Sequence, residues 1–342
     1  MIKKIDITEL KTLMLKALFI RGIEGEYAEF IVDDYIEAEL EEHSSHGLSK
    51  FLLLDEALKQ REGSLELVKQ VGNYAKIDGH KELGHIAGIY CVNKAIELAS
   101  EHGNSIIALN NASRYSRVKP FAKKIAQNGY IGIIMNNGGP AAVAPFGGTT
   151  PIFGTNPICF SFPSKSQEAY VFDFSTSKKV WAEIRQAMLE KRSLPKECFY
   201  DKDGKFTTDP YKADAVASFG GAKGYAMCYA VEILTGAFVG AKMGNQVNDE
   251  YDLGFVFIAL SPEMFSDMER FCEEIDHLAQ EVRNARPIES GKKVFVPGEL
   301  SENRLKKNQQ SGLLSLDSEI IDRITIMSTL LEGGIESNNK TN

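Results

Sequence analysis

The sequence lacks several features that would indicate common classes of protein. Its five cysteines include no Cys-x-x-Cys pair, which favours reduced, mostly buried thiols of a cytosolic protein. No uncharged apolar run reaches the roughly 18 residues of a membrane span. Basic residues are not in excess, because 39 Lys and Arg stand against 47 Asp and Glu, for a net charge of -8. This balance argues against nucleic acid or an anionic membrane as the main partner.

Two nucleotide-binding motifs are also absent. No GxGxxG follows a predicted strand, and no GxxxxGK[ST] occurs, so neither a Rossmann dinucleotide site nor a P-loop is indicated. The N-terminal segment has no small-residue cleavage site, and Lys11 and Lys16 interrupt its apolar positions at helical spacing. It therefore predicts an amphipathic helix rather than a signal peptide, and we expect a cytoplasmic protein.

Chain length and hydrophobic patterning predict two lobes, since cores usually split beyond roughly 250 to 300 residues. Residues 1–72 are expected to form a small helical domain, which the C-terminal helix at 301–335 joins. Residues 73–300 alternate strands and helices and are expected to form an α/β domain that binds cofactor and substrate. The expected strands are 75–77, 105–109, 130–135, 159–162, 170–174, 255–260 and 292–296. The expected helices of this part and of the C-terminus are 83–102, 120–128, 177–190, 220–236, 261–284 and 317–331.

The most unusual stretch of the chain is NNGGPAAVAPFGGTTPIFGTNP, at residues 136–157. It contains five Gly, four Pro and no charged side chain, a composition that suits backbone-lined turns and cannot hold a helix. Because it follows an apolar strand pattern, its backbone N–H groups could face an anionic or amide-bearing ligand. The alternative interpretation is a plain connection of several turns.

A histidine and a lysine lie close together where a predicted helix ends. Ser45-His46-Gly47 is followed by Lys50, and an imidazole exchanges protons near neutral pH while a nearby ammonium can hold a carboxylate. A histidine in such a loop is also commonly a cap or a surface residue. His43 and His46, with Glu42 beside them, suggest a metal site only weakly, since no second cluster supplies further ligands. We therefore expect no metal.

Two further polar groups follow predicted strands. Residues 110–119 form a dense polar and basic patch that includes Arg114, whose planar fork suits a carboxylate or phosphate, although a solvated loop is the alternative. Asp173 lies in an apolar strand, where a carboxylate needs a partner. Lys223 opens a predicted helix after two glycines, so it could help to bind an anion, and a capping role is the alternative.

Taken together, eight segments in a fixed order resemble the malate/L-lactate dehydrogenase family, whose members are NAD(P)-dependent oxidoreductases without a Rossmann fold. They span nearly the whole chain. The segments are SHG (45–47), IDGHKELGH (77–85), APFGG (144–148), FGTNP (153–157), FDFSTS (172–177), DKDGKFTTDP (201–210), GGAKGY (220–225) and VPGE (296–299).

The resemblance implies a non-Rossmann α/β fold with a mixed sheet, NAD or NADP as cofactor, a small acidic substrate, and a homodimer whose cleft lies near the subunit interface. Hydride would pass between the nicotinamide and C2 of a 2-hydroxy or 2-oxo acid, or of a cyclic imine carboxylate. Motif matching implies that His46, Lys50 and Arg114 are catalytic, and that Ser45, Lys50, Arg114 and Asn137 bind substrate. The implied cofactor-facing residues are Pro145, Gly147, Gly148, Thr155, Asn156, Asp173, Ser175, Ser177 and Lys223.

Two positions depart from the family pattern. Lys50 stands where an arginine is usual, which keeps the charge and loses the bidentate geometry. Arg114 stands where a second active-site histidine is usual, and arginine stays protonated, so it cannot move protons as histidine does. Either the substrate carries a second acidic group, or the chain is a catalytically impaired relative that binds a nucleotide or acidic metabolite as a sensor or partner subunit.

Overall fold

The structure is a computed structural model that describes residues 1–329. The chain divides into two compact units. The first consists of Met1–Glu56 together with the chain from Glu299 onward, and the second of Ala57–Gly298. Within the described residues, no helix is both long enough and apolar enough to cross a membrane.

The first unit joins the two ends of the chain. Strand β1 (Ile2–Asp6) pairs antiparallel with β12 (Leu313–Asp317). The strand pair was not predicted, because only Ile5 of β1 is buried and an exposed strand shows little alternation of apolar and polar residues. Its helices are α1 (Ile7–Phe19), α2 (Gly25–Leu40), α3 (Leu48–Phe51), α10 (Glu299–Gln309) and α11 (Ser318–Met327), with η1 (Ser44–His46) and with α4 (Leu54–Leu58), which ends just past the boundary.

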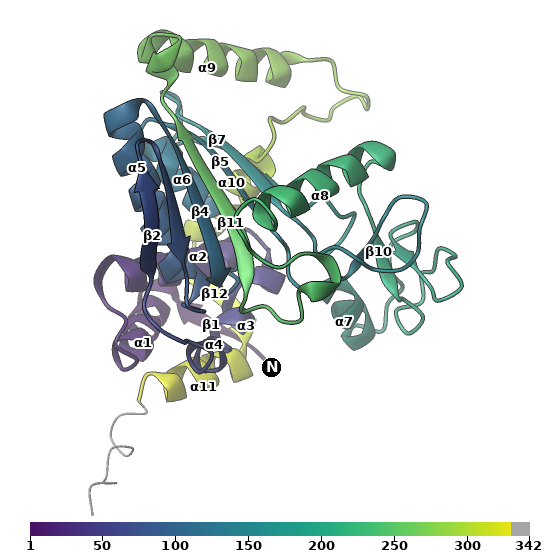
Figure 1. Ribbon diagram of the computed structural model, residues 1–342. Helices are drawn as coiled ribbons and strands as arrows, with labels where there is room; N and C mark the ends of the chain where they lie inside the picture. The colour runs from purple at the N-terminus through teal and green to yellow at the C-terminus, as the bar shows by residue number, and fades with distance from the viewer. Residues whose placement is uncertain (330–342) are drawn as a thin grey trace, which may run out of the picture. The chain divides into compact units, whose positions relative to one another are not determined.

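The second unit is built on a mixed seven-stranded sheet, which confirms the predicted fold class (Figure 1). The strand order is β2-β3-β4-β11-β5-β7-β8. Only β3 and β4 pair in parallel, joined by α5 (Gly84–His102), and the other pairs are antiparallel. The strands are β2 (Glu66–Val71), β3 (Tyr74–Asp78), β4 (Asn104–Ala112), β5 (Ile131–Asn136), β7 (Ile158–Phe162), β8 (Tyr170–Phe174) and β11 (Leu253–Leu260).

One face of this sheet is covered by α5 and α6 (Lys119–Gln127). Phe255 and Phe257 of β11 are fully buried on this face, and Tyr115 packs between the rings of Phe121 and Phe255. Burying side chains of this size stabilises the fold by about 1.5–3 kcal/mol each. The core of the second unit therefore fixes the strand ends from which the candidate site loops emerge.

The opposite face is only partly covered. Helix α8 (Ala222–Thr235) packs on it through Val231, which joins Met135, Ile158 and Val256 in one buried cluster. Tyr74, on β3 of the same sheet, remains exposed. A small three-stranded sheet lies in the same unit, in the order β6-β10-β9. Its strands are β6 (Val143–Ala144), β9 (Phe199–Tyr200) and β10 (Ala215–Ala217).

Several predicted elements need correction. Residues 66–71, expected in the helical domain, form β2, and all six are exposed, so the strand carries no periodic signal. The helix expected from residue 177 is α7 (Ala182–Leu189). Ser261 caps only the short η3 (Pro262–Met264), while Asp267 caps the long α9 (Met268–Asn284).

Near the C-terminus, two more expectations differ from the structure. Residues 292–296 form no strand. The last predicted helix begins at Ser318, because Asp317 serves as its N-cap and accepts from the Glu319 N–H. The end of that prediction, at residues 330–331, lies outside the described residues.

Candidate functional site

In the first unit, the predicted catalytic histidine lies in a short 3-10 turn directly before a helix. His46 ends η1, and its Nδ1 lies 2.9 Å from the Ser45 hydroxyl oxygen. When Nδ1–H donates to the Ser45 oxygen, Nε2 is the ring nitrogen that takes and gives a proton. Lys50 lies one turn further along, in α3, and its backbone N–H donates to the Gly47 carbonyl at 2.9 Å. The structure thus brings Ser45, His46 and Lys50 together in one segment.

The glycine of this segment has a packing reason. A Cβ at position 47 would lie 2.1 Å from Oε1 of Glu39. That same oxygen accepts a hydrogen bond from the Leu48 N–H at 2.9 Å, while burial raises the pKa of the Glu39 carboxyl. A side chain at position 47 would require the Glu39 side chain to shift and would disturb its hydrogen bond with the Leu48 N–H.

In the second unit, the glycine-proline stretch folds back on itself. A Cβ at Gly154 would lie 2.7–2.8 Å from backbone atoms of Gly138. The two segments of the loop that contain these glycines therefore approach each other at a distance that only glycine permits. The side-chain oxygen of Asn156 accepts from the Gly138 N–H at 3.0 Å. Within this stretch β6 also pairs with β10, so it is an ordered scaffold with its own sheet contact.

The two predicted binding asparagines use their side chains inside this scaffold. Asn137 accepts from the Gly254 N–H at 3.0 Å and donates to the Lys242 carbonyl at 3.2 Å. Asn156, fully buried, donates to the Glu232 carboxylate at 2.7 Å. Both amides therefore hold neighbouring backbone in place, and direct contact of either one with a ligand remains a prediction.

Three loops that carry the predicted cofactor-facing residues meet in the second unit. The Thr176 N–H donates to the Thr155 carbonyl at 2.9 Å, and the Phe219 N–H donates to the Thr176 carbonyl at 3.1 Å. A Cβ at Gly221 would lie 3.6 Å from the Phe146 ring, which adjoins Pro145 and Gly147. The predicted residues that these loops carry are Pro145, Gly147, Gly148, Thr155, Asn156, Ser175, Ser177 and Lys223.

Lys223 is exposed in the first turn of α8, and this helix directly follows Gly220 and Gly221, which both have positive φ. The first N–H groups of a helix have no partner within the helix, and its N-terminus favours anions. The ammonium of Lys223 and the backbone N–H groups at the start of α8 are hydrogen-bond donors of the kind that fit the phosphates of a dinucleotide, and the glycine turn places no side chain in front of them.

Asp173 lies on the face of the sheet that α6 covers. Its Oδ2 accepts from the Lys119 N–H at 3.1 Å. The side chain keeps access to solvent, while surrounding protein raises its pKa to about 6, against the opposing charges of Arg117 and Lys119. An acid whose pKa is raised to about 6, and whose charge interacts with two basic residues, fits a binding role.

Asp173→Asn is expected to change how stability depends on pH. The pKa of about 6 in the fold lies above the ordinary 3.8, so ionisation destabilises the folded state as the pH rises from about 4 to about 6. Asparagine cannot ionise. The Tm of the variant minus that of the wild type should therefore increase across this interval, as measured by calorimetry between pH 4 and 7.5. A difference that stays constant with pH would contradict this reading of Asp173.

Arg114 is paired with a residue that the sequence did not point to. Its Nη1 lies 2.6 Å from Oε1 of Glu250, and its backbone N–H donates to the Glu250 carbonyl at 2.8 Å. The acidic run at residues 249–252 is the only sequence signal that could have suggested it. Gly84 packs closely against the residue before Arg114. A Cβ at position 84 would lie 2.3 Å from the Ser113 carbonyl oxygen.

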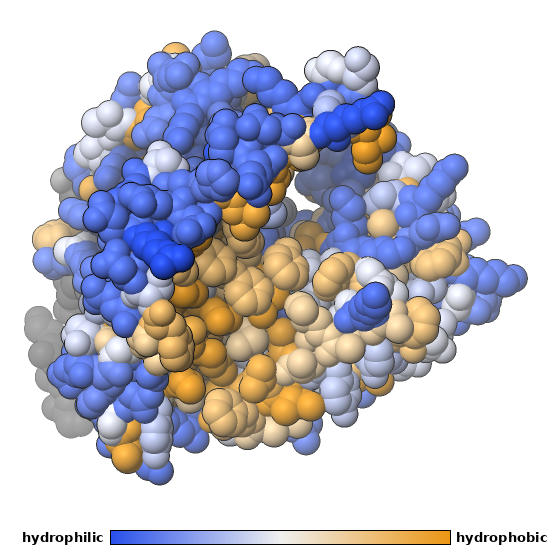
Figure 2. Space-filling model, turned by 90° about the horizontal axis from the view of Figure 1, so that it is seen from above, coloured by the Kyte–Doolittle hydropathy of each residue, from blue (hydrophilic) through white to orange (hydrophobic). Residues whose placement is uncertain are grey.

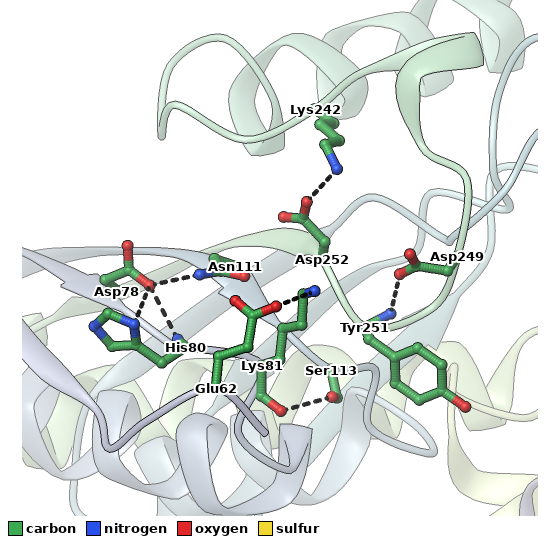
Figure 3. Close-up of polar contacts among 10 residues, drawn as sticks. All are labelled: Glu62, Asp78, His80, Lys81, Asn111, Ser113, Lys242, Asp249, Tyr251 and Asp252. Carbon is green, nitrogen blue, oxygen red and sulfur yellow. Dashed lines mark hydrogen bonds and ion pairs between the residues drawn. The ribbon is translucent and has the colours of Figure 1, made fainter. Parts of the chain in front are cut away.

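The loop before Gly84 lies beside the Arg114 loop. The Lys81 N–H donates to the Asn111 carbonyl at 2.8 Å, and Asp78 accepts from the side chain of Asn111 at 2.9 Å (Figure 3). Lys81 and Asn111 both have positive φ, as does His80. Left-handed backbone costs energy at non-glycine residues, so the two loops are held in a conformation that their contacts must enforce.

The predicted residues are thus divided between the units. Ser45, His46 and Lys50 belong to the first unit, and the remaining predicted residues to the second. A common site around one nicotinamide stays a prediction. Across residues 1–329, no group of three or more His, Cys, Asp or Glu side chains is placed to hold a metal ion.

Comparison with known proteins identifies the family. The family model of malate/L-lactate dehydrogenase matches residues 5–325. Malate/(S)-sulfolactate dehydrogenase of Methanothermus fervidus is 32% identical over 92% of this chain and 94% of its own. Ureidoglycolate dehydrogenase (NAD(+)) of Escherichia coli is 27% identical over 94% of this chain and 93% of its own.

A solved structure agrees with these relatives. Sulfolactate dehydrogenase from Methanocaldococcus jannaschii superimposes with a TM-score of 0.86 and 30% identity, over 95% of this chain and 96% of that one. Relatives and structural neighbour alike are dehydrogenases, and the chain is an enzyme of the NAD(P)-dependent dehydrogenase type. The chain therefore belongs to the malate/L-lactate dehydrogenase family.

Proposed function

We propose that the protein transfers hydride between a nicotinamide and C2 of a 2-hydroxy or 2-oxo acid, or of a cyclic imine carboxylate. The observation that carries the proposal is the Ser45 hydroxyl 2.9 Å from Nδ1 of His46, with Lys50 one helical turn away. This arrangement offers an oriented proton donor and an anchor for a carboxylate in one short segment.

Each residue has a distinct part in the proposed reaction. During reduction, the protonated ring of His46 gives its Nε2 proton to the substrate oxygen or nitrogen and becomes neutral, keeping the proton on Nδ1; during oxidation, the neutral ring takes the proton back at Nε2. Lys50 binds the carboxylate next to C2, assisted by Ser45, and Arg114 binds a second acidic group of the substrate. The nicotinamide supplies or accepts the hydride.

The cofactor is proposed to bind in the second unit. Loops at 145–148, 155–156 and 175–177 offer backbone groups, while Lys223 at the start of α8 offers charge to the phosphates. Asp173 is a further proposed contact of the cofactor, and Asn137 is proposed to bind the substrate. NAD and NADP both remain open, because Arg117 and Lys119 could meet either a 2′-phosphate or the substrate.

A turnover screen tests the proposal. NADH or NADPH is mixed with the enzyme and a panel of 2-oxo monoacids, 2-oxo diacids, sulfonated 2-oxo acids and cyclic imine carboxylates, and absorbance is followed at the nicotinamide band. Oxidation with at least one substrate is expected. A complete lack of oxidation, with the enzyme folded, would refute hydride transfer as its activity.

The second candidate function is a catalytically impaired relative that binds a nucleotide or acidic metabolite as a sensor or partner subunit. The observation that favours it is the ion pair of Arg114 with Glu250. The motif resemblance implies that Arg114 stands where a histidine that moves protons is usual. Trp181 is the single tryptophan, so energy transfer to NADH reports binding alone. Binding without oxidation across the panel would support this candidate.

We also propose that the protein is a homodimer. Apolar side chains are exposed on the incompletely covered face of the sheet and on α8, and Figure 2 shows apolar side chains gathered over a broad area. Faces of this kind usually mark association. The exposed residues on these elements are Tyr74, Ile106, Met227, Tyr229, Ile233 and Leu234.

Light scattering after size exclusion should give about twice the chain mass of 37.8 kDa. A mass equal to one chain at micromolar concentration would refute the homodimer.

The proposed compartment is the cytoplasm. All five cysteines are free thiols, and burial raises the pKa of Cys91 and Cys159, which keeps them unreactive. Free thiols are typical of reducing compartments. The proposed partner is a small acidic substrate, rather than a nucleic acid or a membrane.

A further inference from the structure

Arg114 and Glu250 are joined at two levels. The backbone N–H of Arg114 donates to the Glu250 carbonyl at 2.8 Å, and the two side chains form an ion pair at 2.6 Å. The backbone bond keeps the residues adjacent whether or not their side chains meet. Changing the carboxylate of Glu250 therefore alters the charge next to the guanidinium more than it alters the path of the chain.

Both side chains can be reached from solvent. The side chain of Arg114 is 34% exposed and that of Glu250 is 42% exposed. An ion pair in this environment is weak, because water competes with it. A small anion that reaches Arg114 with good geometry can therefore take the place of the carboxylate.

The other cations around this acidic segment already have acidic neighbours (Figure 3). Lys242 lies 2.6 Å from Asp252. The hydrogen bond to Glu62 raises the pKa of Lys81, with smaller contributions from Asp249 and Asp252. Each of these basic groups is balanced within the protein. Without the Glu250 carboxylate, the guanidinium of Arg114 would lose the acidic partner of this ion pair.

We propose that Glu250 competes with the substrate for Arg114 and so sets the preference between substrates with one and with two acidic groups. The proposal rests on the proposed function. When the site is empty, the Glu250 carboxylate holds Nη1 of Arg114. A substrate whose far end carries a second carboxylate or a sulfonate displaces it, whereas a substrate with a single carboxylate leaves the pair intact.

Glu250→Gln tests the competition directly, since glutamine keeps the size and removes the charge. The ratio of kcat/KM for a 2-oxo diacid to kcat/KM for pyruvate should rise about 3- to 10-fold, with the gain in KM rather than in kcat. An unchanged ratio would overturn the proposal. A lower ratio would also overturn it, because Glu250 would then be orienting Arg114 rather than competing for it.

Asp252→Asn is the matched control. It removes a carboxylate paired at 2.6 Å on the same segment, but its partner is Lys242 and not Arg114. The substrate ratio should stay within about twofold of wild type. An increase equal to that of Glu250→Gln would show a general charge effect and overturn the specific pairing. In an Arg114→Ala background, the effect of Glu250→Gln should disappear.

A binding measurement keeps this test separate from the dehydrogenase proposal. Calorimetric titration with malonate, an unreactive dicarboxylate, should show tighter binding to Glu250→Gln than to wild type, with acetate as the monoacid reference. Tighter malonate binding without any turnover would refute the proposed hydride transfer and support the competition. Equal malonate affinity in an enzyme that turns over would refute the competition alone.

Discussion

Replacing His46 with alanine should lower kcat by roughly two to four orders of magnitude. The imidazole is oriented by the Ser45 hydroxyl at 2.9 Å and is proposed to carry the proton that the reaction moves. In the variant, a water molecule would have to carry the proton, and it would not be held in the orientation that the imidazole has. Steady-state kinetics measure the loss, and NADH binding, followed through Trp181, should persist because the proposed cofactor loops belong to the second unit.

His43→Ala is the matched control for that variant. His43 lies in the same loop as the N-cap of η1, three residues before His46. Its removal should change kcat by less than about threefold, as is usual for an exposed position. Turnover of His46→Ala equal to wild type would remove His46 from the mechanism. Equal losses in the two variants would indicate damage to the loop rather than loss of a proton carrier.

Gly224→Ala should destabilise the second unit by about 3 kcal/mol and weaken NADH binding at least tenfold. A Cβ at this position would lie 1.7 Å from the Phe219 carbonyl oxygen and 2.6 Å from its carbon, both backbone atoms that cannot rotate away. The turn that precedes α8 would have to open, and Lys223 would move with it. Urea unfolding and NADH titration measure the two effects.

Gly291→Ala provides the comparison. Gly291 has a φ of 82° and nothing within 4 Å of an added Cβ, so alanine costs only the left-handed backbone penalty of about 1–2 kcal/mol. NADH affinity should be unaffected. If Gly224→Ala is no worse than Gly291→Ala in either measurement, the close approach to Phe219 is not what holds this turn.

The fold was predictable where local signals and tertiary packing agree. Gly103 ends α5 in the left-handed conformation, and Pro120 lies at the start of α6, as their sequence positions indicate. The strands of the small sheet were missed because they have two or three residues each and no measurable period. Strand β2 was missed for a related reason. All its residues are exposed, and a strand that buries neither face shows no alternation of apolar and polar residues.

The candidate site was predictable to the extent that its chemistry is local. Glycines and prolines of the loops indicate backbone-lined turns from composition alone, and the Ser45-His46 contact joins neighbours in sequence. The pairing of Arg114 with Glu250 spans 136 positions, and nothing near either residue specifies the other. Such contacts are set by the register of β4 against β11, which only the assembled sheet determines.

The pairing of β1 with β12 has a consequence for biosynthesis. The second unit is one continuous segment and can fold while the chain is still being made. The first unit is made of two separate segments, so its N-terminal strand can pair only after residues 313–317 have been made. A chain that ended before residue 313 would therefore still contain His46, but the first unit would lack the pairing of β1 with β12.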